Sequence, residues 1–265
     1  MNSAPPPSAA SQRRWHGTLR AERDTARRER LLEAALELYG TIGFRKTNVM
    51  ALCRESGVSS RSFYELFPTQ EDLLERLYIE LNDEIISALD TTQPLPTDTL
   101  VESTRRIVGS ALAPMLDDER KARVLEIEVV GISESLEQRR HLTMRLLAAA
   151  ISAAFVEFER AYRLIGDEAR PTAVPHPFAE GDPAPAQDEP VFDEKQPSFA
   201  EEEPAFGLTS LVLVGGITEA LVQRIRTPLE RRTSKERFLN EIAEVVLRAH
   251  GIADRQFHAR PVQNP

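Results

Sequence analysis

Apolar residues recur at spacings of three and four along most of this 265-residue chain, which is the period of an α-helix with one buried face. Amphipathic runs of this kind cover residues 26–42, 70–89, 98–113, 117–131, 134–165 and 234–250. Residues 205–227 are apolar nearly all round, which points to a bundle interior or a subunit interface. Aromatic residues make up only 6% of the chain and glycines number only 12, which is poor material for a β-sandwich or a barrel. The sequence therefore predicts an all-α protein.

A single cysteine, Cys53, excludes an intramolecular disulfide and a cysteine-based zinc site. No apolar run approaches the roughly 20 residues that span a bilayer, and the Pro-rich N-terminus lacks the apolar core of a signal peptide. We therefore expect a cytoplasmic protein with no membrane partner.

The net charge of −9 is unevenly distributed. Residues 1–67 carry 11 Lys and Arg against 7 Asp and Glu, whereas residues 167–204 carry 2 against 11. Residues 167–204 alone therefore have a net charge of −9, equal to that of the whole chain, while the N-terminal quarter of the chain is basic. Because a local basic face attracts phosphate whatever the average charge, the acidic total does not exclude a nucleic-acid partner.

The acidic segment also carries 8 of the 18 prolines, which stop both helix and sheet. It is predicted to be a disordered loop over residues 167–204. The alternative is an acidic strip that docks a partner or repels DNA. A disordered arm is also predicted over residues 1–22, and a flexible tail over residues 252–265.

Two short helices are predicted within residues 48–67. Asn48 suits the N-cap of the first helix and Ser59 that of the second, and Gly57 permits the positive φ of a tight turn between them. The apolar residues Val58, Phe63, Leu66 and Phe67 are placed to face inward. Two short helices joined by a glycine-containing turn form the helix-turn-helix unit, whose second helix enters the major groove of DNA.

The side chains expected to project outward from the second helix are Ser60, Arg61, Ser62 and Tyr64. Arginine can pair bidentately with guanine, while hydroxyl groups and a helix N-terminus suit phosphate. Arg45 and Lys46 precede the first short helix and are placed to contact the DNA backbone. Two alternatives stay open: Tyr64 as a partly buried core residue, and Arg61 as a solvated arginine without a partner in DNA.

Residues 25–75 resemble the N-terminal domain of the TetR (tetracycline-repressor) family of bacterial transcription regulators. The matching features are "AALELY" followed by "GF", then "TNV" three residues before Leu52, "GVS" in the turn, and "FYELFPTQEDLL" leading into a long helix. The resemblance implies that Tyr64 touches a phosphate, that Thr47 and Asn48 are the polar pair opening the first short helix, and that residues 60–62 read bases.

Two positions depart from the family pattern. Gln70 stands where the family often has lysine, so one phosphate contact lacks its charge. Cys53 stands where the family usually has alanine, and we expect it to be a small core residue, since a buried thiol with no basic neighbour stays protonated.

The resemblance also implies the organisation of the whole chain. A DNA-binding domain over residues 23–69 would extend into a linking helix at 70–89, followed by a regulatory and dimerisation domain over residues 90–251. The homodimer would form through helices 205–227 and 234–250. A dimer would read a palindromic double-stranded operator, because a two-fold axis relates its two recognition helices and therefore the two half-sites they contact.

By the same resemblance, the protein would be a repressor that a small-molecule effector releases from DNA, as the linking helix swings the two recognition helices out of register. It would reside in the bacterial cytoplasm and associate with the nucleoid when bound to DNA. The sequence itself identifies no effector-binding residue.

Motifs for other chemistry are absent from the sequence. The five histidines are scattered, and no P-loop, G-x-S-x-G or G-x-G-x-x-G motif occurs. The acid pairs Asp117/Asp118 and Glu126/Glu128 are interpreted as helix surface. We therefore expect no metal, no cofactor and no enzymatic activity. Two alternatives remain: a dimeric DNA-binding regulator that needs no ligand, and an all-α small-molecule-binding protein or enzyme.

Overall fold

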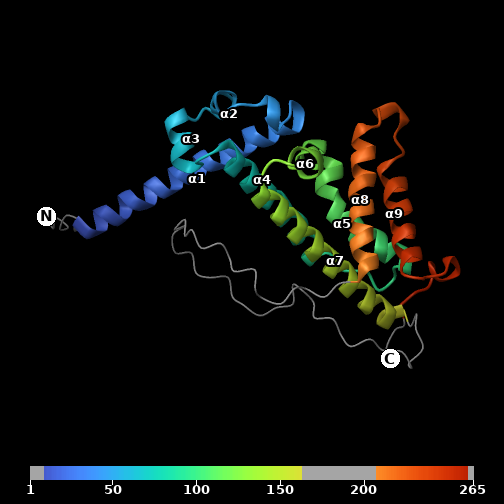
Figure 1. The fold of residues 1–265 in the computed structure, drawn as a ribbon. Coiled ribbons are helices and arrows are strands. Elements are labelled where there is room, and N and C mark those ends of the chain that lie inside the picture. Colours follow the sequence, from blue (N-terminus) through green and yellow to red (C-terminus); the bar gives the residue numbers. More distant parts are fainter. Residues whose placement is uncertain (1–8, 163–206, 262–265) are drawn as a thin grey trace. The chain divides into compact units, whose positions relative to one another are not determined.

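The computed structural model describes residues 9–162 and 207–261. Its helices follow one another in the order shown in Figure 1. The α-helices are α1 (Ala9–Thr41), α2 (Val49–Ser56), α3 (Ser60–Leu66), α4 (Gln70–Thr91), α5 (Leu100–Asp117), α6 (Glu119–Arg123), α7 (Glu134–Tyr162), α8 (Leu208–Arg226) and α9 (Lys235–Ala249). Short helices of other types are η1 (Phe44–Lys46), the π-helix η2 (Val124–Glu128), η3 (Leu229–Arg231) and η4 (Asp254–Gln256).

The chain divides into two compact units. The first combines Met1–Glu84 with Pro114–Glu137, and the second combines Ile85–Ala113 with Gln138–Pro265. Helices α4, α5 and α7 each contribute to both units, and in α5 the division falls beside Pro114, which has no backbone N–H to donate. Sequence reasoning placed 117–131 with the C-terminal helices, whereas contacts group that segment with the first three helices.

The first unit is built on the apolar stripe of α1. Leu31, Ala35 and Tyr39 of this helix are fully buried, as is Phe63 of α3. The Tyr39 ring packs edge-on against Phe44 at 5.3 Å, and burial raises the pKa of its phenol above the ordinary value. Helix α1 begins at Ala9, so most of the segment predicted as a disordered arm, 1–22, is helical instead.

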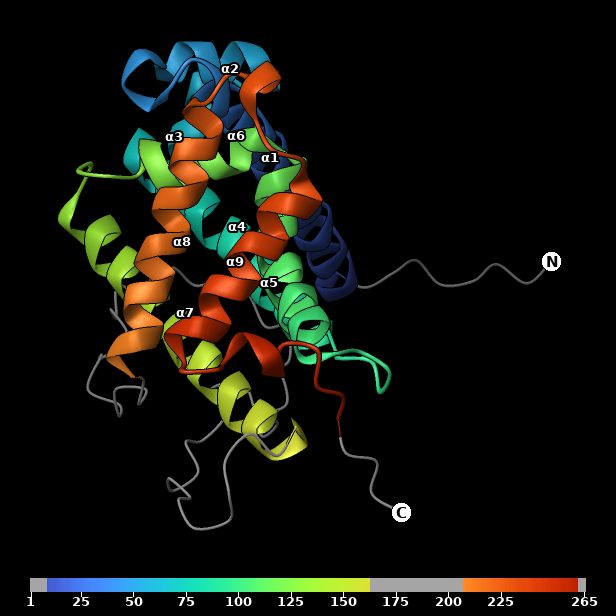
Figure 2. The ribbon, with the colours of Figure 1, turned by 90° about the vertical axis from the view of Figure 1, so that its right-hand side faces the viewer.

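Helices α7, α8 and α9 pack on one another in the second unit. Ser152 of α7 donates a 2.8 Å hydrogen bond to Ser210 of α8, and the rings of Phe155 and His250 stack with centroids 3.4 Å apart. Figure 2 shows α8 and α9 side by side, joined by the turn that contains η3. Burial lowers the pKa of His250 below its ordinary value.

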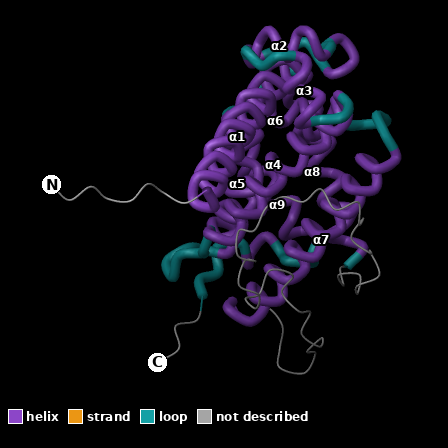
Figure 3. The backbone as a smooth tube through the Cα atoms, turned by 90° about the vertical axis from the view of Figure 1, so that its left-hand side faces the viewer, coloured by secondary structure: helices purple, strands orange, loops and turns teal. Residues whose placement is uncertain are grey.

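The described residues contain helices and connecting loops but no strand, as Figure 3 shows, which confirms the all-α class. The predicted loop at 167–204 lies outside the described residues, as do the ends of the predicted arm and tail. One member of each acid pair, Asp118 and Glu128, is not the solvated surface residue that the sequence predicts. Asp118 caps α6, and the Glu128 side chain is only 12% exposed.

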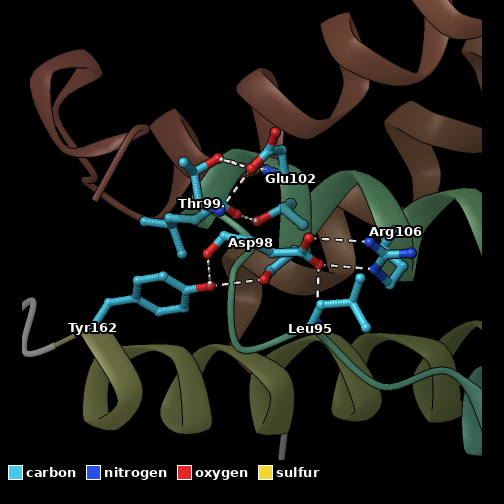
Figure 4. A network of polar contacts seen from close by, with 9 residues as sticks. Leu95, Asp98, Thr99, Glu102, Arg106 and Tyr162 are labelled. Carbon is cyan, nitrogen blue, oxygen red and sulfur yellow. Dashed lines mark hydrogen bonds and ion pairs between the residues drawn. The ribbon is translucent and has the colours of Figure 1, made fainter. Parts of the chain in front are cut away.

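A polar network fixes the N-terminal end of α5 (Figure 4). Asp98 is buried and accepts two hydrogen bonds from Arg106, at 2.8 and 3.0 Å, which hold the pKa of its carboxyl below the ordinary value. The Tyr162 hydroxyl shares a 2.7 Å hydrogen bond with Ser103 and donates to the Asp98 carbonyl oxygen at 3.2 Å. These contacts tie the start of α5 to the last turn of α7.

The segment after α9 takes part in this end of the unit. The backbone N–H groups of Leu100 and Val101 donate to the carbonyl oxygens of Ala259 and Phe257, each at 2.9 Å. The Phe257 side chain is buried. Residues 252–261, predicted as part of a flexible tail, therefore supply partners for N–H groups that the start of a helix leaves without one.

Candidate nucleic-acid interface

Two short helices and the turn between them form the helix-turn-helix that the sequence predicts. The Asn48 side chain accepts from the N–H of Ala51 at 2.9 Å, and Ser59 accepts from the N–H of Ser62 at 3.2 Å. Gly57 ends α2 with φ of 67°, a conformation that side chains disfavour. Both predicted N-caps and the predicted turn are confirmed.

A small apolar core holds the two helices in place. Val58 in the turn is 5% exposed, and Phe63 of α3 is fully buried between the rings of Tyr64 and Phe67. Cys53 is half-buried, so it lies at the edge of this core and not deep within it. With one face of α3 fixed inward, its opposite face is presented to solvent.

The outward face of α3 carries Ser60, Arg61 and Tyr64. The Arg61 side chain is 90% exposed, and Tyr64 is 57% exposed. The reading of Tyr64 as a buried core residue is therefore excluded, although its ring rests on the edge of Phe63. A guanidinium, a phenol and a hydroxyl on one exposed helix face are suitable donors for phosphates and base edges.

Arg61 has a partner that sequence reasoning missed. Its Nε donates to Glu65 one turn later, at 3.0 Å. Exposed pairs of this kind contribute only about 0.3–0.5 kcal/mol, so base contact can replace the pair at little cost. The spacing of four along a helix would have identified Glu65, whose carboxylate could also accept from the amino group of cytosine.

Two of the predicted DNA contacts serve the fold. Thr47 is only 8% exposed, and its hydroxyl donates to the Gly43 carbonyl oxygen at 2.9 Å. Ser62 is half-buried, and its hydroxyl oxygen accepts from Ser59 at 3.1 Å. These two hydroxyls hold the turns that lead into α2 and α3, and their contacts with DNA stay a prediction.

Lys46 and Asn48, which precede α2, are both exposed. Lys46 is predicted to contact the DNA backbone, and Asn48 to be one of the polar pair that opens the helix. Gln70, which replaces the family's usual lysine, is part-buried. Its amide donates to the carbonyl oxygens of Phe44 and Thr47, at 3.3 and 3.1 Å. Gln70 therefore joins the start of α4 to the turn before α2, a structural role that its position as the first residue of α4 did not reveal.

Within residues 9–162 and 207–261, no group of three or more His, Cys, Asp or Glu side chains is arranged to hold a metal ion. The helix-turn-helix presents hydrogen-bond donors and the exposed guanidinium groups of Arg54 and Arg61, which is chemistry for binding a polyanion.

The comparisons agree with this geometry. Residues 31–77 match the family described as bacterial regulatory proteins of the tetR family. Among solved structures, a bacterial regulatory protein in the tetR family from Rhodococcus RHA1 is 16% identical, with a TM-score of 0.57, and 86% of this chain and 98% of that chain are covered. No curated protein sequence matches the chain.

Two further structures share the fold. FadR from Bacillus halodurans, a fatty acid degradation regulator, is 12% identical with a TM-score of 0.55, covering 83% of this chain and 94% of its own. FadR from Bacillus subtilis, solved in complex with stearoyl-CoA, is 13% identical with a TM-score of 0.54, covering 83% and 98%. Likeness at these identities establishes the fold.

The helix-turn-helix on an all-α scaffold defines a DNA-binding transcriptional regulator. Residues 31–77 thus match the tetR family of bacterial regulatory proteins, and the chain has the fold of solved regulators of that family.

Proposed function

We propose that this regulator is a homodimeric repressor that reads a two-fold symmetric operator and is released from it by an apolar small molecule. The observation that carries the DNA-binding part is the exposed face of α3, held outward by the buried Phe63 and capped by Ser59. Such a repressor acts in the cytoplasm and associates with the nucleoid through its operators. It performs no chemical step.

The DNA contacts follow from which predicted side chains are exposed. Arg61 reads a base, while Tyr64, Ser60, Lys46 and Asn48 bind phosphates and set the register on the duplex. Ser59 caps α3 by accepting from the N–H of Ser62, which holds the start of the helix in place.

Dimerisation through α8 and α9 is supported by apolar surface that the described residues leave uncovered. Leu208 is 75% exposed and Val212 is 65% exposed, four residues apart on one face of α8. Gly216 continues this face, and a Cβ built on it would meet nothing within 4 Å. No helix among the described residues packs closely against this glycine. The open surface beside it could therefore accommodate a helix of a second copy. Val245 of α9 is also exposed.

A membrane is the other environment that could cover such helices. By length and composition alone, α7 and α8 could each cross one, with a mean hydropathy of 1.3 and 28% of the window buried in either helix. Yet α8 carries Glu219 in its interior, and a charge there costs about 2.5–3.5 kcal/mol in a bilayer. A second protein copy can leave Glu219 in water while it covers Val212, and we therefore favour the dimer.

An open cleft in the second unit supports an effector site. Its volume is about 610 Å³, within the usual range for small-molecule pockets. Small side chains of α7, including Ala150 and Ala154, leave the space, and Leu89 of α4 and Ile107 of α5 line it as well. A ligand in this cleft touches α4, the helix that begins beside the helix-turn-helix at Gln70.

The lining indicates the chemical class of the effector. Among the described residues, apolar groups dominate the lining, Glu157 is its charged residue, and no Lys or Arg contributes. The lining formed by the described residues therefore suits an uncharged apolar molecule or an acyl chain, and it offers no cation to the phosphates of a CoA group. In this respect the proposed effector differs from the stearoyl-CoA bound by FadR of Bacillus subtilis.

The DNA-binding part is tested by selecting sequences from a random duplex library with the purified full-length protein. We expect an enriched site with two-fold symmetry and half-sites about one helical turn apart. Enrichment of a single unrepeated half-site would contradict the dimeric mode, and failure to enrich any sequence would contradict the proposed function.

The effector part is tested by thermal shift and by release of the selected DNA, using stearyl alcohol, stearic acid and stearoyl-CoA as probes. We expect the alcohol to act at the lowest concentration, and Ala154→Phe, which fills the cleft, to abolish the response while operator binding persists. If no probe binds, the ligand-independent regulator is the better reading.

A further inference from the structure

The segment from Asp118 to Gly131, which contains α6 and η2, packs against the residues that lead into the helix-turn-helix. Both belong to the first unit. In Figure 1, α6 lies beside α1, and the hydrogen bonds place it at the C-terminal end of that helix. We name this segment, residues 118–131, the clasp.

Glu128 is the centre of the clasp. Its Oε2 accepts from the backbone N–H of Phe44 at 2.8 Å, and its Oε1 accepts from Arg123 at 2.9 Å. Arg123 in turn donates to the Thr41 carbonyl oxygen at 2.8 Å, which is one of the carbonyls that the end of α1 leaves without a helical partner. One carboxylate and one guanidinium thus hold both sides of the turn between α1 and η1.

A second set of contacts brings the backbones together. Arg120 donates to Glu37 of α1 at 2.6 Å and to Asp118 at 2.7 Å, and Arg120 keeps the pKa of Asp118 below its ordinary value. A Cβ built on Gly40 would lie 2.4 Å from the Arg120 Cβ and 2.8 Å from its Cα. The approach of α6 to α1 therefore requires glycine at position 40.

The turn that the clasp holds is the entrance to the DNA-binding face. Phe44 begins η1, and its carbonyl oxygen accepts from Gln70. Lys46 and Asn48, both exposed, follow within four residues. Phe44 is therefore held by Glu128 at its N–H and by Gln70 at its carbonyl. Movement of either partner would reposition the start of α2.

We propose that Glu128 is a positioning residue for DNA binding: through the Phe44 N–H, the clasp fixes the turn that sets where α2 and α3 meet the duplex. The clasp touches no DNA itself. Chain connectivity gives it a regulatory use, because its two ends continue into α5, beyond Pro114, and into α7. A change in those helices that pulls on residues 118–131 would reach the helix-turn-helix through Glu128. The proposal rests on the DNA-binding function proposed above.

Amide hydrogen exchange at Phe44 tests the contact directly, without DNA. Among the hydrogen bonds of the described residues, the Phe44 N–H donates to Glu128. In Glu128→Ala this amide should exchange at least tenfold faster than in the wild type, and Glu230→Gln, an exposed carboxylate on η3, should leave it unchanged. Equal exchange in Glu128→Ala and the wild type would overturn the contact.

Operator affinity tests the positioning role. Fluorescence anisotropy is measured at 15 °C with folded, fully active dimer, so that lower stability alone cannot change Kd. We expect Glu128→Ala to raise Kd at least tenfold and Glu128→Gln to raise it less. If Kd for the operator stays within twofold of the wild type and only Tm falls, Glu128 has a structural role alone.

Gly40→Ala provides a second, independent variant. Alanine favours the helix more than glycine does, so α1 itself is not weakened. The added methyl group must nevertheless push α6 away, because its contact is with Arg120 backbone as well as side chain. We expect faster Phe44 exchange and at least tenfold weaker operator binding. Normal affinity in a variant whose Phe44 exchanges fast would overturn the positioning role. If the wild type binds no DNA, the proposed function fails while the exchange result still reports on the clasp.

Discussion

Helices α3 and α8 are both exposed along one face, but the two faces have opposite chemistry. Helix α3 presents Arg61 and Tyr64 and is capped by the Ser59 side chain. Helix α8 presents Leu208 and Val212, and its N-cap, Gly207, makes no side-chain capping bond. A polar face on a short capped helix is stable in water and can bind reversibly, whereas an apolar face gains free energy from being covered.

The difference indicates two kinds of partner. Binding at α3 should weaken steeply with salt, because it depends on charge and displaces counterions from phosphate. Association at α8 should depend little on salt, because it depends on apolar area. The predictions below separate these two behaviours, beginning with the largest expected effect.

Val212→Glu should have the largest effect. In the proposed two-fold dimer, a glutamate at position 212 would face the same glutamate of the second copy, so the dimer should dissociate to monomer. Operator affinity should then fall by roughly 10²-fold or more, because binding of the second half-site is no longer intramolecular. Analytical ultracentrifugation and anisotropy give both values.

Thr233→Glu is the matched control for this variant, since it adds the same charge at an exposed loop position and should remain a dimer. A Val212→Glu protein that stays dimeric would remove α8 from the interface.

Arg61→Ala should weaken binding to the selected operator by about 1–3 kcal/mol and relax specificity at one base pair, because one guanidinium reads one guanine. Competition with operators substituted at single positions measures this. An equal loss on random duplex would instead make Arg61 a phosphate contact. The dimer constant should stay at its wild-type value.

Ser59→Ala should lower the stability of the first unit by about 1 kcal/mol, because the N–H of Ser62 loses its capping acceptor. Denaturant unfolding followed by circular dichroism measures the change. The dimerisation constant is the control, since α8 has no such cap to lose. An unchanged unfolding midpoint would show that packing of Phe63 alone stabilises α3.

The smallest effect concerns His250 in the second unit. Burial lowers its pKa in the folded protein below the ordinary 6.5, so the unfolded chain binds the proton more readily. Stability is therefore full above about pH 6.5 and decreases as the pH falls through the folded pKa. His250→Phe, which keeps the ring on Phe155, should show a smaller drop in Tm between pH 7.5 and 5.5. An equal drop would assign the pH dependence to other groups.

Sequence reasoning succeeded where the determining contacts are local. The caps Asn48 and Ser59, the turn at Gly57 and the inward face of α3 depend on residues within four positions of one another, so their pattern is visible in one stretch of chain. The same locality makes the Arg61–Glu65 pair predictable in principle, because i and i+4 residues meet on a helix.

It failed where the contact joins distant segments. Glu128 meets Phe44 across 84 positions, and nothing in its neighbourhood distinguishes it from a solvated surface acid. The order of residues 252–261 depends on the N–H groups of α5, more than 150 positions away.

The central claim is that the exposed face of α3 binds operator DNA as part of a dimer. Anisotropy titration of the selected operator at several salt concentrations, with wild type and Arg61→Ala in parallel, tests it most directly. We expect log K to fall linearly with log salt concentration in both proteins, with a lower affinity for Arg61→Ala on the operator alone. No binding by the wild type even at low salt, or identical operator curves for the two proteins, would contradict the account.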